Sequence, residues 1–208
     1  MSTVTSAQPM VSPAGPADSG VYRFTIGEYE RMVLDDPRVE LIDGQVVRKM
    51  GKNPPHSWCT KALINVVPPL IPIGLTYRVE QPVRIPDHDE PEPDFAIVRG
   101  TDNDYQDRHP EPADVAVLIE VSESSLPRDR GKRLSTNARC GIPVYWIINL
   151  NDRQVEIYTE PKGGKSPAYR RRTDFASNDK APLVIEGNEV AKVPVIDLLP
   201  SDAPAGST

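Results

Sequence analysis

The sequence predicts an α/β (α+β) fold with a mixed β-sheet flanked by helices. Residues 115–121 form the most hydrophobic run of the chain, and apolar residues on both faces are typical of a central strand. A helical pattern over 128–139 and a second apolar run over 144–148 follow, which predicts a strand–helix–strand crossover. Turn residues between shorter apolar runs predict hairpins elsewhere. The sheet is therefore expected to be mixed rather than uniformly parallel.

Elements before the crossover are marked by caps, turns and prolines. Thr25 and Glu28 have capping-box spacing and predict a helix over 26–34, whereas Asp43-Gly44 predicts a hairpin between 40–42 and 45–47. The remaining elements expected here are a helix over 56–67, a bent or edge strand over 75–85 that Pro82 interrupts, a buried strand over 95–98 and a polar loop over 100–113.

After the crossover, 144–148 and 154–158 are expected to pair through the Asn151-Asp152 turn, and short strands are expected near 182–185 and 189–193. The basic run from Tyr169 to Arg172 favours a solvated strand or loop face. The alternative interpretation is a patch that contacts DNA phosphates.

Length and composition indicate one domain over 21–200, with disordered segments at 1–20 and 201–208. No apolar run approaches the roughly 18 residues of a membrane span, and the N-terminus lacks a signal-peptide pattern, so a soluble, cytoplasmic protein without membrane contact is expected. Cys59 and Cys140 lack metal-ligand spacing and are expected to be free thiols. The net charge of −6 argues against a protein that coats nucleic acid, but not against a nuclease.

Acidic residues at strand ends carry the chemical prediction. Glu120 is the only charge of an apolar strand, Asp94 directly precedes a buried strand, and Glu40 begins another. Buried carboxylates are costly unless they are paired or bound to a metal, and oxygen ligands of this kind suit Mg²⁺ or Mn²⁺. Each residue also has a structural interpretation. Glu120 could pair with an arginine, Asp94 could end a turn, Glu40 could be exposed, and His56 could have no role.

Six segments in this order resemble the Uma-type family of putative restriction endonucleases, within the PD-(D/E)XK nuclease superfamily. They are Glu40-Leu41-Ile42-Asp43-Gly44, His56, Pro93-Asp94, Ile119-Glu120-Val121-Ser122, Asp129-Arg130-Gly131 and Gly141-Ile142-Pro143-Val144-Tyr145-Trp146. The resemblance runs from about Phe24 to Tyr158, and an extension to Leu199 is expected. It implies a restriction-endonuclease-like core with extra N-terminal strands, and Glu40, Asp94 and Glu120 as metal ligands. His56 and Asp129 match family positions with accessory roles.

The chain departs from this pattern at the residues expected to complete catalysis. The superfamily lysine two positions after the glutamate is Ser122 here, and the family's helical lysine position holds Arg133, with Lys132 beside it. A tyrosine expected four residues further on is Asn137. Arg133 retains the charge but cannot act as a base. Lys132 or Arg133 is therefore the expected catalytic cation beside Asp94 and Glu120.

Three functions are compatible with these residues. The preferred one is a Mg²⁺-dependent endonuclease that hydrolyses DNA and leaves a 5′-phosphate, as the resemblance implies. The second is a nuclease fold that has lost turnover and binds nucleic acid or a protein, which the changes at Arg133 and Asn137 favour. The third is a metal-dependent hydrolase of small phosphoesters. A homodimer is expected if both strands of a duplex are cut.

Overall fold

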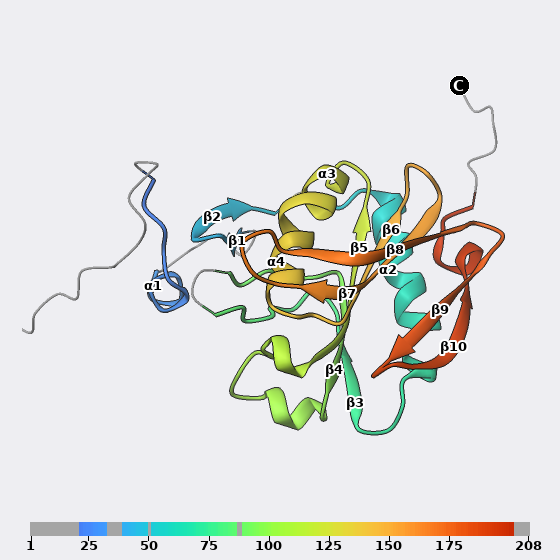
Figure 1. Ribbon diagram of the computed structural model, residues 1–208, viewed down its shortest axis with the longest axis horizontal. Coiled ribbons are helices and arrows are strands. Elements are labelled where there is room, and N and C mark those ends of the chain that lie inside the picture. Colours follow the sequence, from blue (N-terminus) through green and yellow to red (C-terminus); the bar gives the residue numbers. More distant parts are fainter. Residues whose placement is uncertain (1–20, 33–38, 50, 87–88, 202–208) are drawn as a thin grey trace, which may run out of the picture.

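A six-stranded mixed sheet forms the centre of the computed structural model (Figure 1), which describes residues 21–32, 39–49, 51–86 and 89–201. Its strands, in spatial order, are β3 (Leu75–Arg78), β4 (Phe95–Arg99), β5 (Val115–Ser122), β6 (Val144–Asn149), β7 (Gln154–Lys162) and β8 (Ala168–Ala176). β5 and β6 pair in parallel and the other neighbours pair antiparallel. The predicted mixed sheet with one crossover is therefore confirmed.

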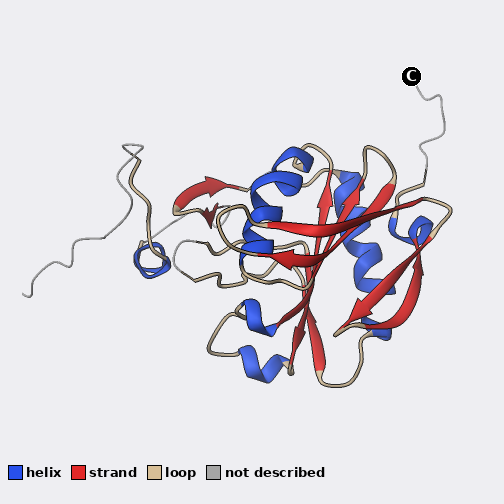
Figure 2. Cartoon of the chain, in the orientation of Figure 1, coloured by secondary structure: helices blue, strands red, loops and turns tan. Residues whose placement is uncertain are grey.

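One face of the sheet packs against α2 (Pro54–Val66) and a separate hairpin of β9 (Lys180–Ile185) and β10 (Asn188–Pro194) (Figure 2). Cys59 and Leu63 of α2 share a core with alternate residues of the sheet, among them Ile119 and Trp146. This alternation follows from the period of two along a strand. Helix α2 is thereby anchored with its first turn at the end of β5.

The opposite face is covered by the crossover segment, a nearly continuous helix of α3 (Leu126–Arg128), a π-helical turn (Asp129–Arg133) and α4 (Leu134–Arg139). Leu126 and Leu134 pack on this face against Leu118, Tyr145 and Ile147. The π-helical turn widens the helix beside the end of β5, and such turns are frequently found at functional sites.

The N-terminal elements are α1 (Ile26–Arg31) and a hairpin of β1 (Val39–Ile42) and β2 (Gln45–Arg48). The predicted capping box and hairpin are both confirmed, and Asp43 and Gly44 have the positive φ angles, 52° and 70°, that such a two-residue turn requires. A bridge between Leu41 and Glu90 fastens β1 to the segment before β4. The hairpin thus carries Glu40 to the sheet.

One predicted strand is shorter in the structure. The strand expected over 75–85 ends at Arg78, because Glu80 has a φ of 52° and Pro82 cannot donate to a ladder. The run Tyr169–Arg172, for which a solvated strand or loop face was favoured, lies on β8, a mostly exposed edge strand. The C-terminal part of the helix predicted over 26–34, the disordered segment expected over 1–20 and residues 202–208 lie outside the described residues.

Short 3₁₀ helices, Pro68–Leu70, Asp102–Tyr105, Pro112–Asp114 and Val195–Leu198, complete the described structure. Neither Cys59 nor Cys140 forms a disulfide bond, as expected, and burial raises the pKa of the Cys59 thiol. Within the described ranges, no helix combines the length and apolar character needed to cross a membrane.

Candidate active site

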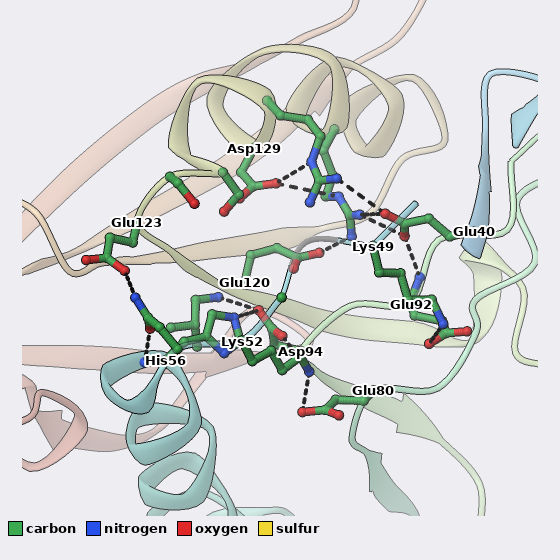
Figure 3. Close-up of a pocket in the computed structure, with 17 residues that line it drawn as sticks. Glu40, Lys49, Lys52, His56, Glu80, Glu92, Asp94, Glu120, Glu123 and Asp129 are labelled. Carbon is green, nitrogen blue, oxygen red and sulfur yellow. Dashed lines mark hydrogen bonds and ion pairs between the residues drawn. The ribbon is translucent and has the colours of Figure 1, made fainter. Parts of the chain in front are cut away.

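A polar pocket of about 210 Å³ opens where β4 begins and β5 ends (Figure 3). Six of the seven residues that the sequence predicted for the site line it, namely Glu40, His56, Asp94, Glu120, Asp129 and Arg133. They come from β1, the first turn of α2, the start of β4, the end of β5 and the π-helical turn. Segments far apart in the sequence therefore meet at one edge of the sheet.

Asp94 and Glu120 lie beside each other because of the strand register. Phe95 pairs with Ile119 in the antiparallel ladder, so the preceding Asp94 faces Glu120. The Val121 backbone N–H donates to Asp94 Oδ2 at 2.8 Å, and His56 Nε2 lies 3.2 Å from the same oxygen. Burial alone would raise the pKa of Asp94. The hydrogen bonds from His56 and Val121 outweigh burial and hold this pKa below its ordinary value.

Glu120 shares the guanidinium of Arg133 with two other carboxylates. Arg133 Nη1 contacts Glu120, Nη2 lies 3.1 Å from Glu40 Oε2, and Nε lies 3.7 Å from Asp129 Oδ1. Only 6% of the Arg133 side chain is exposed. Burial raises the pKa of Glu120 well above its ordinary value, and the negative charges of Asp94, Asp129 and Glu40 add to this effect against the attraction of Arg133.

Acidic groups outnumber basic groups in the buried part of the pocket. Glu40, Asp94, Glu120 and Asp129 are all buried there, whereas Arg133 is the only buried cation among the described residues. Arg128, which pairs with Glu40, is about one-third exposed. A further cation would stabilise the ionised form of these groups, because buried carboxylates without counter-charge are strongly unfavourable.

Comparison with known proteins identifies the family to which the chain belongs. The model of the Uma2 family, described as "Putative restriction endonuclease", matches residues 26–191. The chain belongs to the Uma2 family. The expected family is thus confirmed, and the matched region contains every pocket residue described above. No curated protein matches the sequence.

A solved structure shares the fold. The crystal structure of a "putative nuclease belonging to DUF820" from Anabaena variabilis superposes with a TM-score of 0.57 and 18% sequence identity, over 84% of this chain and 97% of that chain. At this identity the likeness establishes the fold alone. Together, the family and the fold make this Uma2 chain a member of a nuclease family with a nuclease-like fold.

The two basic residues that the sequence left as alternatives have different surroundings. Arg133 reaches Glu40 and Glu120, whereas Lys132 Nζ lies 2.7 Å from Asp43 Oδ2 at the surface. Lys132 does not line the pocket. At the position of the superfamily lysine, the Ser122 hydroxyl donates to Asp129 at 2.7 Å. The Uma2 chain thus has arginine, not lysine, beside its central glutamate.

Sequence reasoning missed Lys52 and Arg128, which also line the pocket. Lys52 Nζ lies 3.4 Å from Asp94 Oδ1, and Arg128 Nη1 lies 3.4 Å from Glu40 Oε1. The only sequence signal for Lys52 is its place just before Asn53, the N-cap of α2. Its approach to Asp94 depends on tertiary packing, so periodicity could not reveal it.

The pocket offers hard oxygen donors of the kind that a magnesium ion with water ligands would use. Among the described residues, no three His, Cys, Asp or Glu side chains are grouped to hold one ion. Mg²⁺ does not need three, because it commonly binds one or two carboxylates, waters and substrate phosphates. Asp94 and Glu120 are adjacent hard oxygen donors in a site where acidic groups outnumber basic ones, and a bound cation would stabilise their ionised forms.

Proposed function

We propose that this protein is a Mg²⁺- or Mn²⁺-dependent endodeoxyribonuclease. The observation that carries the proposal is that Asp94 and Glu120 lie beside each other where β4 begins and β5 ends, in a pocket with four buried carboxylates and one buried cation. Membership of a nuclease family supports phosphodiester hydrolysis as the reaction. In this proposal Asp94 and Glu120 hold the ion, and Glu40 completes the acidic wall of the site.

The protein's own groups prepare the site. The hydrogen bonds from His56 and the Val121 N–H fix the carboxylate of Asp94. Arg133 holds Glu120 and Glu40 in place and keeps two neighbouring carboxylates from repelling each other. The metal, when bound, would lower the pKa of a water and neutralise charge on the phosphate.

The proposed reaction is hydrolysis of the DNA backbone. A bond forms between the water oxygen and phosphorus, and the bond between phosphorus and the 3′ oxygen breaks. The attacking water gives up one proton to solvent and the departing 3′ oxygen takes up one proton from solvent, so the products are a 3′-hydroxyl and a 5′-phosphate. Arg133 cannot remove a proton from the water. Its contribution is electrostatic, through the position and charge of Glu120.

Cleavage of supercoiled, linear and single-stranded DNA in Mg²⁺ and in Mn²⁺ tests the proposal, with EDTA as the metal-free control. We expect nicking or cutting that EDTA abolishes, and 5′-phosphate ends. A small phosphodiester in the same panel tests the third function, hydrolysis of small phosphoesters. If that compound is hydrolysed while the DNA stays intact, the substrate is a small phosphoester and not DNA. Absence of any hydrolysis in either metal would overturn the enzymatic proposal.

One observation favours a second candidate, a nuclease fold without turnover that binds nucleic acid or a protein. The guanidinium of Arg133 already contacts Glu120 and Glu40, and arginine replaces the lysine that a base or water-orienting role would use. This candidate predicts Mn²⁺ and DNA binding without cleavage. Homodimer formation stays a prediction, which analytical ultracentrifugation with and without duplex DNA would test.

A further inference from the structure

We propose that Lys52 binds the backbone phosphate of the substrate in this pocket and thus supplies the cation that Ser122 and Arg133 do not. The inference rests on the proposed function and names a residue outside the six segments that carry the family resemblance. Lys52 precedes α2 and points toward Asp94 from the side of the pocket opposite the helical crossover (Figure 3). Its Nζ lies 3.4 Å from Asp94 Oδ1.

Lys52 is placed for contact with a ligand. Its side chain is 35% exposed, and it lines the pocket beside a candidate metal ligand that is itself buried. A phosphate whose oxygens approach Asp94 and Glu120 through a bound cation would come within reach of this ammonium. A lysine in this place acts as a point charge on phosphate, and this role requires no proton transfer.

The other lysine and arginine side chains that line the pocket pair with carboxylates other than Asp94. Arg133 is buried among three carboxylates, and its departure would leave Glu120 without its ion pair. Arg128 pairs with Glu40. Lys49 pairs with Glu92 and makes a further interaction. Lys52 is therefore the pocket cation that combines exposure with direct contact to Asp94.

The backbone at Glu80 supports a positioned lysine. Glu80 has a φ of 52°, a left-handed conformation that is unfavourable for a residue with a side chain. Its N–H donates to the Pro93 and Asp94 carbonyls at 3.2 and 3.3 Å, and its carboxylate pairs with Lys52. Backbone strain of this kind persists where surrounding structure imposes it and is often found at functional sites. Glu80 thus acts as a positioning residue that keeps the ammonium at the pocket mouth.

The test compares Lys52→Gln and Lys52→Arg with Lys61→Gln, a matched control that removes an exposed lysine of α2 outside the pocket. Binding of a fluorescent DNA duplex is measured as a function of salt, with Ca²⁺ in place of Mg²⁺. We expect Lys52→Gln to reduce the slope of log affinity against log salt by about 0.9, the value for one phosphate contact in duplex DNA. Lys52→Arg and Lys61→Gln should keep the wild-type slope.

Two further measurements separate a phosphate contact from a structural role. In Mg²⁺, Lys52→Gln should slow cleavage on the order of 10²-fold, the typical loss when one charge-stabilising group is removed. Its Mn²⁺ affinity should stay the same or increase, because Lys52 competes for Asp94 and is not a ligand.

A Lys52→Gln protein with the wild-type salt slope would overturn the inference, whatever its cleavage rate. If the wild type binds the duplex but does not cut it, the proposed enzymatic function fails and the salt slope alone decides the role of Lys52. A wild-type protein that does not bind the duplex would overturn both.

Discussion

Two buried glutamates on either side of β6 allow stability and function to be separated. Glu120 pairs across the ladder with Ile147, and Ile147 pairs with Glu156, so both carboxylates lie on the same face. Each contacts an arginine of the π-helical turn, Arg133 for Glu120 and Arg130 for Glu156. Their pKa values shift in opposite directions. Substitution by glutamine should therefore have opposite consequences at the two positions.

Glu156→Gln is expected to reduce stability. Burial raises the pKa of Glu156, but hydrogen bonds from Arg130, Tyr158 and Asn149 outweigh burial and lower it from 4.5 to about 2. At about 1.36 kcal/mol per pKa unit this shift corresponds to roughly 3 kcal/mol. Because Arg130 is one-third exposed and screened by solvent, we expect a loss of about 1.5–3 kcal/mol in the free energy of unfolding.

The pH dependence has a definite sign. A folded-state pKa below the unfolded value stabilises the protein above about pH 4.5, and this contribution is lost as pH falls toward about 2. Glu156→Gln should therefore flatten the acid limb of the stability curve in that range. Its cleavage rate should equal that of the wild type, because Glu156 does not line the pocket.

Glu120→Gln is expected to behave in the opposite way. Burial and three acidic neighbours disfavour the Glu120 carboxylate, and Arg133 retains Glu40 and Asp129 as partners after the substitution. The variant should keep the wild-type free energy of unfolding within about 1 kcal/mol or gain stability, because no buried charge is left unpaired. It should lose cleavage and bind Mn²⁺ more weakly.

Urea unfolding at several pH values, with plasmid cleavage in Mn²⁺ on the same preparations, measures both properties. A Glu120→Gln protein that is several kcal/mol less stable and still cuts DNA would refute the reasoning. So would a Glu156→Gln protein that is fully stable but inactive, because Glu156 would then belong to the functional site.

Three further perturbations have defined outcomes. Arg133→Ala should lower the free energy of unfolding by about 3–5 kcal/mol, because it leaves buried carboxylates unpaired. In a thermal scan, Mn²⁺ should raise the melting temperature of this variant more than that of the wild type; equal shifts would contradict a cation site shared by these carboxylates. Gly44→Ala should lower the free energy of unfolding by about 1–3 kcal/mol, because φ is +70° and the new Cβ would lie 2.6 Å from Arg23 Cβ. An unchanged urea unfolding curve would contradict this expectation. Arg170→Ala with Arg171→Ala should leave the salt slope of duplex binding unchanged, because neither residue lines the pocket; a slope smaller by about two would restore the DNA-contact interpretation.

Local signals in the sequence were sufficient for most of the fold. The Asp43-Gly44 turn, the Thr25 capping box and the apolar run of β5 each act over a few residues, and all three were confirmed. For β8 the sequence left a solvated strand and a loop as alternatives, because its residues are mostly exposed and lack an alternating apolar pattern. An edge strand of this kind is specified by pairing with β7, over 154–162, and not by its own hydrophobic pattern.

The site could be predicted only in part, because some of its residues are placed by tertiary packing and not by a local sequence pattern. Glu120 and Asp94 are conspicuous because charge is costly where burial is expected. The choice between Lys132 and Arg133 depended on the phase of the crossover helix, which the π-helical turn changes. Lys52 lies in a segment without periodicity, and the strained backbone of Glu80 that holds it has no sequence signature.

Asn137 stands where the family pattern has a tyrosine, and the structure shows the surroundings of this residue. It is buried where a tyrosine was expected, and its amide Nδ2 has no hydrogen-bond partner. It lines a small cavity beside Thr136 and Arg133. The loss of an aromatic side chain here is local, because the pocket carboxylates are held by Arg133, Arg128 and the start of α2.

The central claim, that Asp94 and Glu120 hold a cation, is tested most directly by titrating Mn²⁺ into the wild type and into Asp94→Asn. Binding is followed by calorimetry and by the electron paramagnetic resonance signal of free Mn²⁺. Asparagine keeps an oxygen that can accept from the Val121 N–H and removes the charge, so the fold is preserved. The account predicts saturable binding to the wild type and at least tenfold weaker binding to Asp94→Asn. Equal binding by the two proteins, or none by the wild type, would contradict a cation held by Asp94 and Glu120.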